Sequence, residues 1–293
     1  MSCNHLFFLK LASNLIFPYI WLMKKHITIC ADDYGQTLEI SQAIIDLINM
    51  QRISATSCMV NSKHFTKSAV LLKSLTDKAD IGLHFNLTEG NLVANHSRKL
   101  DTLPITLLKS TLRLLDKQYL TKELNAQLDV FEEHMGFTPD FIDGHQHVHQ
   151  IPQVRDVILQ VYEKRLRKSR CYVRALDKSL INLNNISFKK IILYSLGATK
   201  FKSLLIKHDI PHNKSFSGIY DFKKSYNYKN YFNKFLQEIT NDGLLMCHPG
   251  YPSNSTESDL LVDSRHHELA FFKSQLFLDL LGKNSVSLTK YKK

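Results

Sequence analysis

Acidic and histidine side chains follow several short apolar runs of this sequence, and as a set they could bind a metal ion. They are Asp32 and Asp33 after residues 27–31, His84 after 81–83, His145 after 141–144, and His248 after 244–247. In an α/β barrel the carboxyl ends of the parallel strands meet on one face, so these side chains are expected to gather there. The pattern indicates a metal-dependent hydrolase.

Asp32 and Asp33 place two carboxylates side by side at the end of a strand. In such a turn they point in different directions. One can therefore bind a metal while the other stays free to take a proton from the metal-bound water. Their mutual repulsion also favours a nearby cation. A pair of aspartates alone is equally typical of a turn or a helix N-cap, so this interpretation depends on the histidines at the other strand ends.

Three histidines at alternate positions form the strongest local pattern. In an extended segment His145, His147 and His149 would lie on one face, although a turn before Pro152 could redirect the last of them. Two inward imidazoles and one carboxylate suit a divalent metal and leave coordination positions open for water and substrate. Asp143 could orient one of these imidazoles by accepting a hydrogen bond from it.

Three further side chains have candidate roles at the same face. His248 could protonate a leaving amine or stabilise an oxyanion. Arg174, at the end of another short apolar run, could hold Asp32 ionised and oriented. The alternation that starts at His84 places Asn86 on the same side of its strand, where it could contact a substrate.

The elements that must position these residues alternate between strand and helix. Strands are expected at about residues 26–31, 54–60, 81–87, 141–144, 171–174 and 243–247, with helical spacing between them. One helix is predicted to start at Thr121 as its N-cap and to stop at Gly136, and a single last helix is predicted to end near Gly282. This order predicts a parallel sheet. Chemistry at many strand ends favours a single-domain (β/α) barrel, in an incomplete or distorted TIM-like form, over an open sheet.

The 293 residues, with 44% hydrophobic content, are enough for one large domain. Residues 1–22 are apolar but broken by Lys10 and Pro18, and they lack the basic start and cleavage site of a signal peptide. We interpret them as an extension of uncertain status, with contact to a membrane as the second interpretation, and place the domain at 23–293. The five cysteines show no C-x-x-C pairing. They are expected to be buried free thiols in a reducing, cytoplasmic compartment.

The net charge of +11 is concentrated in one region. Residues 164–234 hold 17 Lys/Arg and 3 Asp/Glu, a net of +14, whereas the rest holds 21 basic and 24 acidic residues, a net of −3. Such a region suits an acidic partner, such as a phosphate- or lipid-linked glycan or an anionic membrane, or it is a solvated lysine-rich face. No DNA- or RNA-binding motif accompanies it, which argues against nucleic acid. The sequence leaves a homo-oligomer open.

Taken together, these stretches resemble the YdjC-like carbohydrate deacetylases, which include the chito-oligosaccharide deacetylases. The similarity is carried by residues 31–35 (Ala-Asp-Asp-Tyr-Gly), 82–90 (Gly-Leu-His-Phe-Asn-Leu-Thr-Glu-Gly), 143–149 (Asp-Gly-His-Gln-His-Val-His) and 246–251 (Met-Cys-His-Pro-Gly-Tyr), with shorter matches at 54–61, 173–174, 216–218 and 265–269. Tyr34 stands where the family commonly has Phe. The basic region around residues 175–235 is poorly matched, which leaves the substrate open.

The resemblance implies a deacetylase barrel with a divalent cation, usually Mg²⁺, although an Asp/His₂ site also suits Zn²⁺ or another divalent ion. It implies Asp33, His84 and His145 as metal ligands and Asp32 as the base that activates water to attack the acetamide of an N-acetylated amino sugar. By a looser similarity, it implies His248 as the acid. The alternatives are another metal-dependent hydrolase, such as an amidohydrolase or a phosphodiesterase, and a non-catalytic sugar- or lipid-binding protein. A further interpretation is a peripheral membrane enzyme acting on a lipid- or phosphate-linked glycan.

Overall fold

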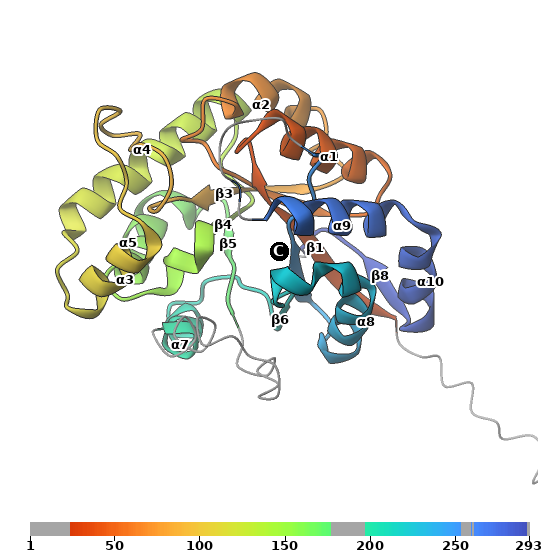
Figure 1. Cartoon of the computed structure of the whole chain (residues 1–293). Helices are drawn as coiled ribbons and strands as arrows, with labels where there is room; N and C mark the ends of the chain where they lie inside the picture. Colours follow the sequence, from red (N-terminus) through yellow and green to blue (C-terminus); the bar gives the residue numbers. More distant parts are fainter. Residues whose placement is uncertain (1–23, 177–196, 253–258, 260, 292–293) are drawn as a thin grey trace, which may run out of the picture.

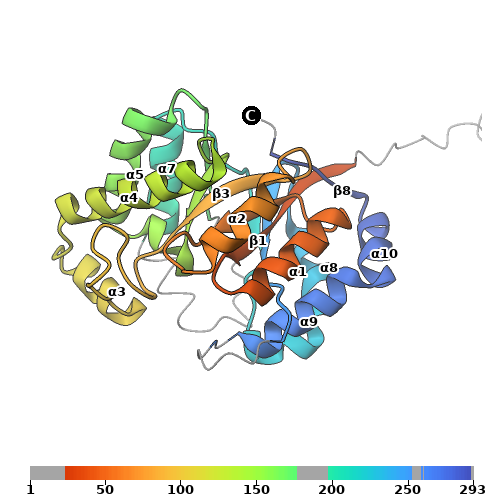
Figure 2. The ribbon, with the colours of Figure 1, turned by 90° about the horizontal axis from the view of Figure 1, so that it is seen from above.

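The computed structural model describes residues 24–176, 197–252, 259 and 261–291 (Figure 1). The predicted extension at residues 1–22 lies outside the described residues, and so does the part of the basic region at 177–196. The rest forms a single α/β domain. Figures 1 and 2 show a curled sheet in the middle, with helices around its outer side.

All strand pairings in the sheet are parallel. The strands are β1 (Lys25–Tyr34), β2 (Ala55–Cys58), β3 (Asp80–Phe85), β4 (Phe141–Gly144), β5 (Tyr172–Val173), β6 (Phe216–Ser217), β7 (Gly243–Cys247) and β8 (Val286–Leu288). Their order is β5-β4-β3-β2-β1-β7-β6, and β8 pairs with the start of β1. In the described part of the chain, an isolated bridge between Val173 and His212 links the two ends of this curled sheet in place of a continuous ladder. The predicted incomplete TIM-like barrel is therefore confirmed.

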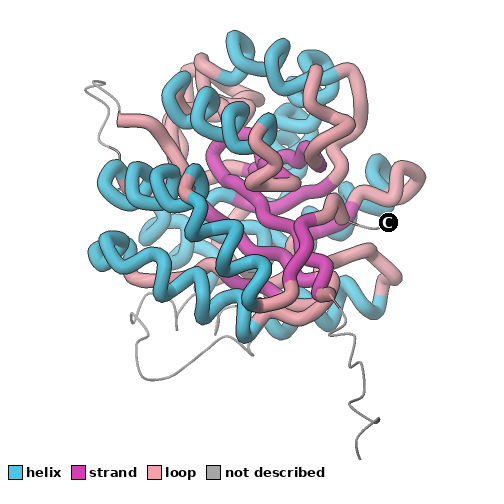
Figure 3. The backbone as a smooth tube through the Cα atoms, turned by 90° about the vertical axis from the view of Figure 1, so that its right-hand side faces the viewer, coloured by secondary structure: helices cyan, strands magenta, loops and turns pink. Residues whose placement is uncertain are grey.

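Helices connect successive strands and cover the outside of the sheet, as the tube in Figure 3 shows. The α-helices are α1 (Leu38–Asn49), α2 (Phe65–Lys73), α3 (Leu103–Thr111), α4 (Lys117–Met135), α5 (Val154–Val161), α7 (Thr199–Lys207), α8 (Tyr228–Glu238), α9 (Val262–Lys273) and α10 (Gln275–Lys283). Shorter turns are η1 (His145–Gln150), η2 (Tyr162–Leu166) and η6 (Phe222–Asn227). In α1, Ala43, Ile44 and Leu47 share one face and are fully buried. Burying an isoleucine or leucine side chain of this kind stabilises the fold by about 1.5–3 kcal/mol.

Two predicted helix boundaries are wrong. The helix that ends at Gly136 starts earlier than predicted, because the carboxylate of Asp116 caps it by accepting from the backbone N–H of Gln118 at 2.8 Å. Thr121 lies inside this helix, where its hydroxyl bonds to the backbone. The predicted single last helix is instead α9 and α10. The extended backbone of Ser274 separates them and lets each bury its own apolar face.

Other local predictions agree with the structure. The strands predicted at residues 141–144 and 243–247 coincide with β4 and β7. Cys30, Cys58, Cys171 and Cys247 are buried and form no disulfide. Among the described residues, none of the helices combines the length and apolar character needed to span a bilayer.

Candidate metal centre

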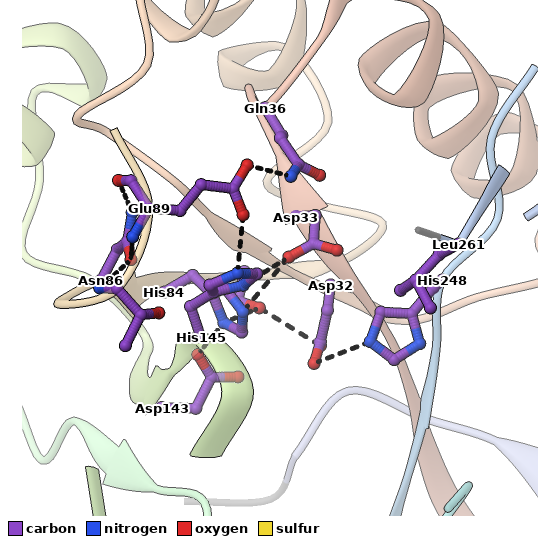
Figure 4. Close-up of polar contacts among 12 residues, drawn as sticks. Asp32, Asp33, Gln36, His84, Asn86, Glu89, Asp143, His145, His248 and Leu261 are labelled. Atoms are coloured by element: carbon purple, nitrogen blue, oxygen red, sulfur yellow. Dashed lines mark hydrogen bonds and ion pairs between the residues drawn. The ribbon is translucent and has the colours of Figure 1, made fainter. Parts of the chain in front are cut away.

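The two adjacent carboxylates diverge because β1 is irregular at its carboxyl end. Along a regular strand successive side chains point to opposite faces. Here the register against β2 shifts between Ala31 and Tyr34, and Asp33 has a φ of 72°. Aspartate tolerates this left-handed conformation better than most residues, and such bulges are common beside functional sites. As a result Asp32 and Asp33 both lie at the same end of the sheet, but each contacts a different set of residues (Figure 4).

Asp33, His84 and His145 form a buried cluster whose ligand atoms lie within 4.8 Å of one another. Asp33 Oδ1 is 3.4 Å from His84 Nε2 and 3.1 Å from His145 Nδ1. Two ligand atoms that each lie about 2.1 Å from one ion, at the usual angles, are separated by about 3.0–3.4 Å. The cluster therefore fits a single divalent cation, with one oxygen and two imidazole ligands.

His84 is oriented by the carboxylate behind it. Its Nδ1 lies 2.6 Å from Asp143 Oδ1, so Nε2 is the ring nitrogen that faces Asp33. Burial by itself would lower the pKa of His84, but the carboxylates of Asp143 and Asp33 raise it to about 10. The same negative field that holds a proton here favours a cation, which would displace that proton on binding.

Asp33 is held by an arginine from the other end of the sequence. Arg265, on α9, donates to Asp33 Oδ2 at 2.8 Å and to Asp259 at 2.6 Å. Burial would raise the pKa of Asp33, but the charge of Arg265 and hydrogen bonds from the two histidines hold it well below its usual range. Oδ2 is thus engaged by the guanidinium, while Oδ1 faces the imidazoles.

Asp32 belongs to a second acidic group, which also contains Cys30 and Asp143. A guanidinium already occupies the space between these three residues. Arg174 donates to both oxygens of Asp32, at 2.7 and 2.6 Å, and lies 2.6 Å from Asp143 Oδ2 and 3.2 Å from Cys30 Sγ. Burial would raise the pKa of Asp32, but Arg174 keeps it far below its usual range, so the carboxylate is ionised. The Arg174 guanidinium neutralises this second group, so the first cluster is the candidate metal site.

His248 lies beside Asp32, with 4.0 Å between His248 Nε2 and Asp32 Oδ2. Its imidazole packs edge to face against the ring of Phe222, with 5.4 Å between the two ring centroids. Its backbone N–H donates to the buried carboxylate of Glu268 at 2.6 Å. Burial lowers the pKa of His248, so its imidazole is neutral at physiological pH. A neutral imidazole is thus positioned next to an ionised carboxylate.

The three alternating histidines do not lie on one face, because their segment is the turn η1 and is not extended. Gln146 and His147 adopt positive φ values of 52° and 61°, and this reverses the chain. Only His145 reaches the metal cluster. His149 Nε2 bonds to the backbone oxygen of Arg174 at 3.1 Å, and burial lowers its pKa to about 3. His147 contacts the rings of His149 and Phe216.

Asn86 is fully buried and shapes the loop that follows β3. Its Oδ1 accepts from the backbone N–H groups of Thr88 and Glu89, and its Nδ2 donates to the backbone oxygen of Glu89. This loop carries Glu89 to His145, where the Glu89 carboxylate lies 3.1 Å from His145 Nε2.

Sequence reasoning did not single out Glu89, Arg265, Gln36 or Glu268, although all of them contact the site. Glu89 lies in the 82–90 stretch, and Arg265 and Glu268 lie in the 265–269 stretch. Their presence inside stretches shared with a family was the available signal. Their individual contacts come from segments far apart in the sequence and could not be read from local spacing.

A curled parallel sheet with an Asp/His₂ cluster at its carboxyl end defines an α/β half-barrel protein with a candidate divalent-metal centre. The chain belongs to the YdjC-like protein family, whose model matches residues 26–283. This confirms the family that the sequence indicated.

Similar proteins agree with this assignment. A carbohydrate deacetylase from Xenopus laevis is 25% identical over 307 residues, which cover 90% of this chain and 96% of that protein. A chitooligosaccharide deacetylase from Proteus mirabilis is 26% identical over 172 residues, which cover 55% of this chain and 63% of that protein. A crystal structure from Enterococcus faecalis, described as a cellobiose-phosphate cleavage protein, has a TM-score of 0.68 at 18% identity and covers 92% of this chain and 98% of its own. That last similarity shows a shared fold.

Proposed function

We propose that this protein is a divalent-metal-dependent carbohydrate deacetylase that removes N-acetyl groups from amino sugars. The observation that carries the proposal is the cluster of Asp33, His84 and His145 next to the ionised pair of Asp32 and Arg174. Support also comes from family membership and from the relatives named as carbohydrate or chitooligosaccharide deacetylases.

In this proposal Asp33, His84 and His145 would hold a divalent cation, which would supply a Lewis acid for the acetamide carbonyl and for the attacking water. Asp32 is the base that accepts the proton of the attacking water. Arg174 keeps this carboxylate ionised and fixes its direction through two hydrogen bonds. The low pKa of Asp32 makes it a weak base, so proton transfer to it depends on the acidity that a cation gives to the water.

His248 is the acid that protonates the departing amine. Its neutral imidazole needs a proton first, and the proton accepted by Asp32 can reach His248 Nε2 across the 4.0 Å between them through one water or a small closure. A bond forms from the water oxygen to the acetyl carbon, and the carbon–nitrogen bond breaks. The second proton of the water stays on the acetic acid and is lost to solvent, so the products are acetate, the free amino sugar and one proton.

The ion and the substrate are open within this proposal. The resemblance implies Mg²⁺, and one carboxylate with two imidazoles also suits Zn²⁺ and other divalent ions. The described part of the basic region approaches the site at η6, where Phe222 contacts His248. A phosphate- or lipid-linked glycan, with amidohydrolase or phosphodiesterase chemistry, is therefore the alternative substrate class. Cytoplasmic location and a homo-oligomer remain predictions.

The test is acetate release from a panel of N-acetylglucosamine oligomers and related acetylated amino sugars, after reconstitution with Mg²⁺ or Zn²⁺. Acetate release by the parent protein that is lost in Asp32→Asn, with metal content unchanged, would support the proposal. Full activity in Asp32→Asn would overturn the assigned base. No release across the panel by metal-loaded protein would overturn the deacetylase proposal and favour the alternative class.

A further inference from the structure

Glu89 belongs to a closed circuit of polar contacts around the candidate metal cluster. The circuit runs through Asp33, Arg265, Gln36, Glu89 and His145 and returns to Asp33. Arg265 Nη2 donates to Asp33 Oδ2 at 2.8 Å and to Gln36 Oε1 at 2.9 Å. Gln36 Nε2 donates to Glu89 Oε1 at 2.8 Å. Glu89 Oε2 lies 3.1 Å from His145 Nε2, and His145 Nδ1 lies 3.1 Å from Asp33 Oδ1. Figure 4 shows the part of this circuit from Gln36 to Asp33.

The chemistry of the groups fixes the direction of each bond. Arginine can only donate, so the amide oxygen of Gln36 must face Arg265 and its NH₂ must face Glu89. An ionised carboxylate can only accept, so His145 Nε2 must carry the proton that it shares with Glu89. By the same rule His145 Nδ1 donates to Asp33 Oδ1 when no ion is bound, and an ion held by Asp33 would replace that proton and take the Nδ1 lone pair. The amide orientation thus follows from the hydrogen-bond partners.

The backbone around Glu89 is anchored to α4. Gln127 Oε1 accepts from Asn86 N at 3.1 Å, and Gln127 Nε2 donates to Asn86 O at 2.8 Å. Glu123, fully buried, accepts from the backbone N–H groups of Val93 and Ala94 at 3.0 Å each. The loop therefore holds Glu89 in place even though 46% of its side chain is exposed.

We propose that Glu89 is the positioning residue for His145, and that it sets the Nε2–H tautomer so that Nδ1 binds the metal. The inference rests on the proposed metal centre and assigns it a second carboxylate–imidazole pair. His84 uses the mirror arrangement, because its Nδ1 faces Asp143 and its Nε2 faces the cluster. One imidazole is thus fixed by a buried carboxylate and the other by a half-exposed one, and the second can be changed without creating a buried defect.

The test measures Zn²⁺ affinity by competition with a chelator, with no dependence on turnover. Loss of a carboxylate that orients a ligating histidine typically costs roughly 10–100-fold in metal affinity. We expect this loss in Glu89→Ala. Glu89→Gln should lose less zinc affinity than Glu89→Ala, because its amide oxygen can still accept from His145. It should still lose some, because its NH₂ would face the NH₂ of Gln36. Glu133→Ala, which removes a carboxylate from the exposed face of α4, is the matched control and should bind Zn²⁺ as the parent does.

Ring-nitrogen NMR of the zinc-loaded, ¹⁵N-histidine-labelled protein supplies the second readout, with the His145 signals assigned by His145→Gln. We expect a metal-bound Nδ1 and a protonated Nε2. Parent-like affinity in Glu89→Ala, or coordination of zinc through His145 Nε2, would overturn the inference and leave the proposed function intact. Failure of the metal-loaded parent to release acetate would instead count against the proposed function alone. A parent protein that binds no metal would overturn both.

Discussion

Arg174 and Asp32, 142 positions apart in the sequence, form a two-bond ion pair that is almost completely removed from solvent. The same guanidinium lies 2.6 Å from Asp143, so one cation neutralises two buried carboxylates. It also connects the carboxylate proposed as base to the carboxylate that orients His84. Removal of this arginine should therefore affect both the folding and the chemistry of the protein.

Arg174→Met should destabilise the fold by about 3–5 kcal/mol, because it leaves Asp32 and Asp143 buried and uncompensated. Urea unfolding followed by circular dichroism measures the change in the free energy of unfolding. Arg165→Met is the matched control. Arg165 pairs with Asp129 and Glu132 at the surface, so its loss should cost about 1 kcal/mol or less. Equal losses of unfolding free energy in Arg174→Met and Arg165→Met would contradict a larger stabilisation by the buried pair.

Removal of the metal should lower thermal stability as well as activity. A ligand that binds only the folded state raises its stability with concentration, so added Zn²⁺ should raise the Tm of the chelated parent protein. In Asp33→Ala and His84→Ala this rise should disappear. His96→Gln, a change at an exposed loop histidine outside the cluster, should keep it. A Tm that stays constant on metal addition to the parent would argue against the centre.

His248→Gln should separate two kinds of substrate. The departing amine of an acetamide needs a proton, so release of acetate from an amino sugar should fall by roughly 10²–10⁴-fold in kcat. An activated aryl acetate has a leaving group that needs no proton, and its hydrolysis should change little. Asp32→Asn should lose both activities. Equal losses on both substrates in His248→Gln would show that this histidine is not the acid.

Glu268 should make stability depend on pH. Burial raises its pKa to about 7 from the usual 4.5, because the folded state favours the protonated carboxyl despite hydrogen bonds from Tyr220 and from the backbone of His248. Its contribution to stability is therefore fully present below about pH 4.5 and is lost as the pH rises through about 7.

Glu268→Gln should remove that dependence. From pH 5 to pH 7.5 the parent should lose free energy of unfolding relative to this variant. Denaturant titration of both proteins at each pH measures the difference. Glu133→Gln, at an exposed position on α4, should follow the parent across the range. A pH-independent difference for Glu268→Gln would contradict the raised pKa.

Much of the site could be predicted because it lies at strand ends. Apolar runs locate β1, β3, β4 and β7, and the polar residues that follow them must lie at one edge of a parallel sheet. The sequence pattern alone therefore predicts that Asp33, His84 and His145 lie together, as they do. The curl of the sheet followed from the same observation, since an open sheet would have spread those strand ends apart.

The rest could not be predicted because it depends on backbone irregularities and distant contacts. The positive φ of Asp33 and the turn at Gln146 and His147 leave no periodic signal. The turn η1 requires Gly144, since a Cβ there would lie 2.9 Å from the backbone nitrogen of His149. The contact of Arg265 with Asp33 spans 232 positions and joins α9 to β1, so no local pattern could have shown it.

The position of β1 in the sheet has a consequence for how the protein is made. This strand carries Asp32 and Asp33, it comes first in chain order among the described strands, and its neighbours include β7 and β8, the last two of them. During translation β2 can pair with one edge of β1 early, but the edge that pairs with β7 and β8 stays unpaired until those strands have been made, and an unpaired strand edge favours aggregation. The proposed chemistry therefore depends on strands that are made long after its carboxylates, because a nascent chain without β8 holds Asp32 and Asp33 on a strand that lacks part of its support.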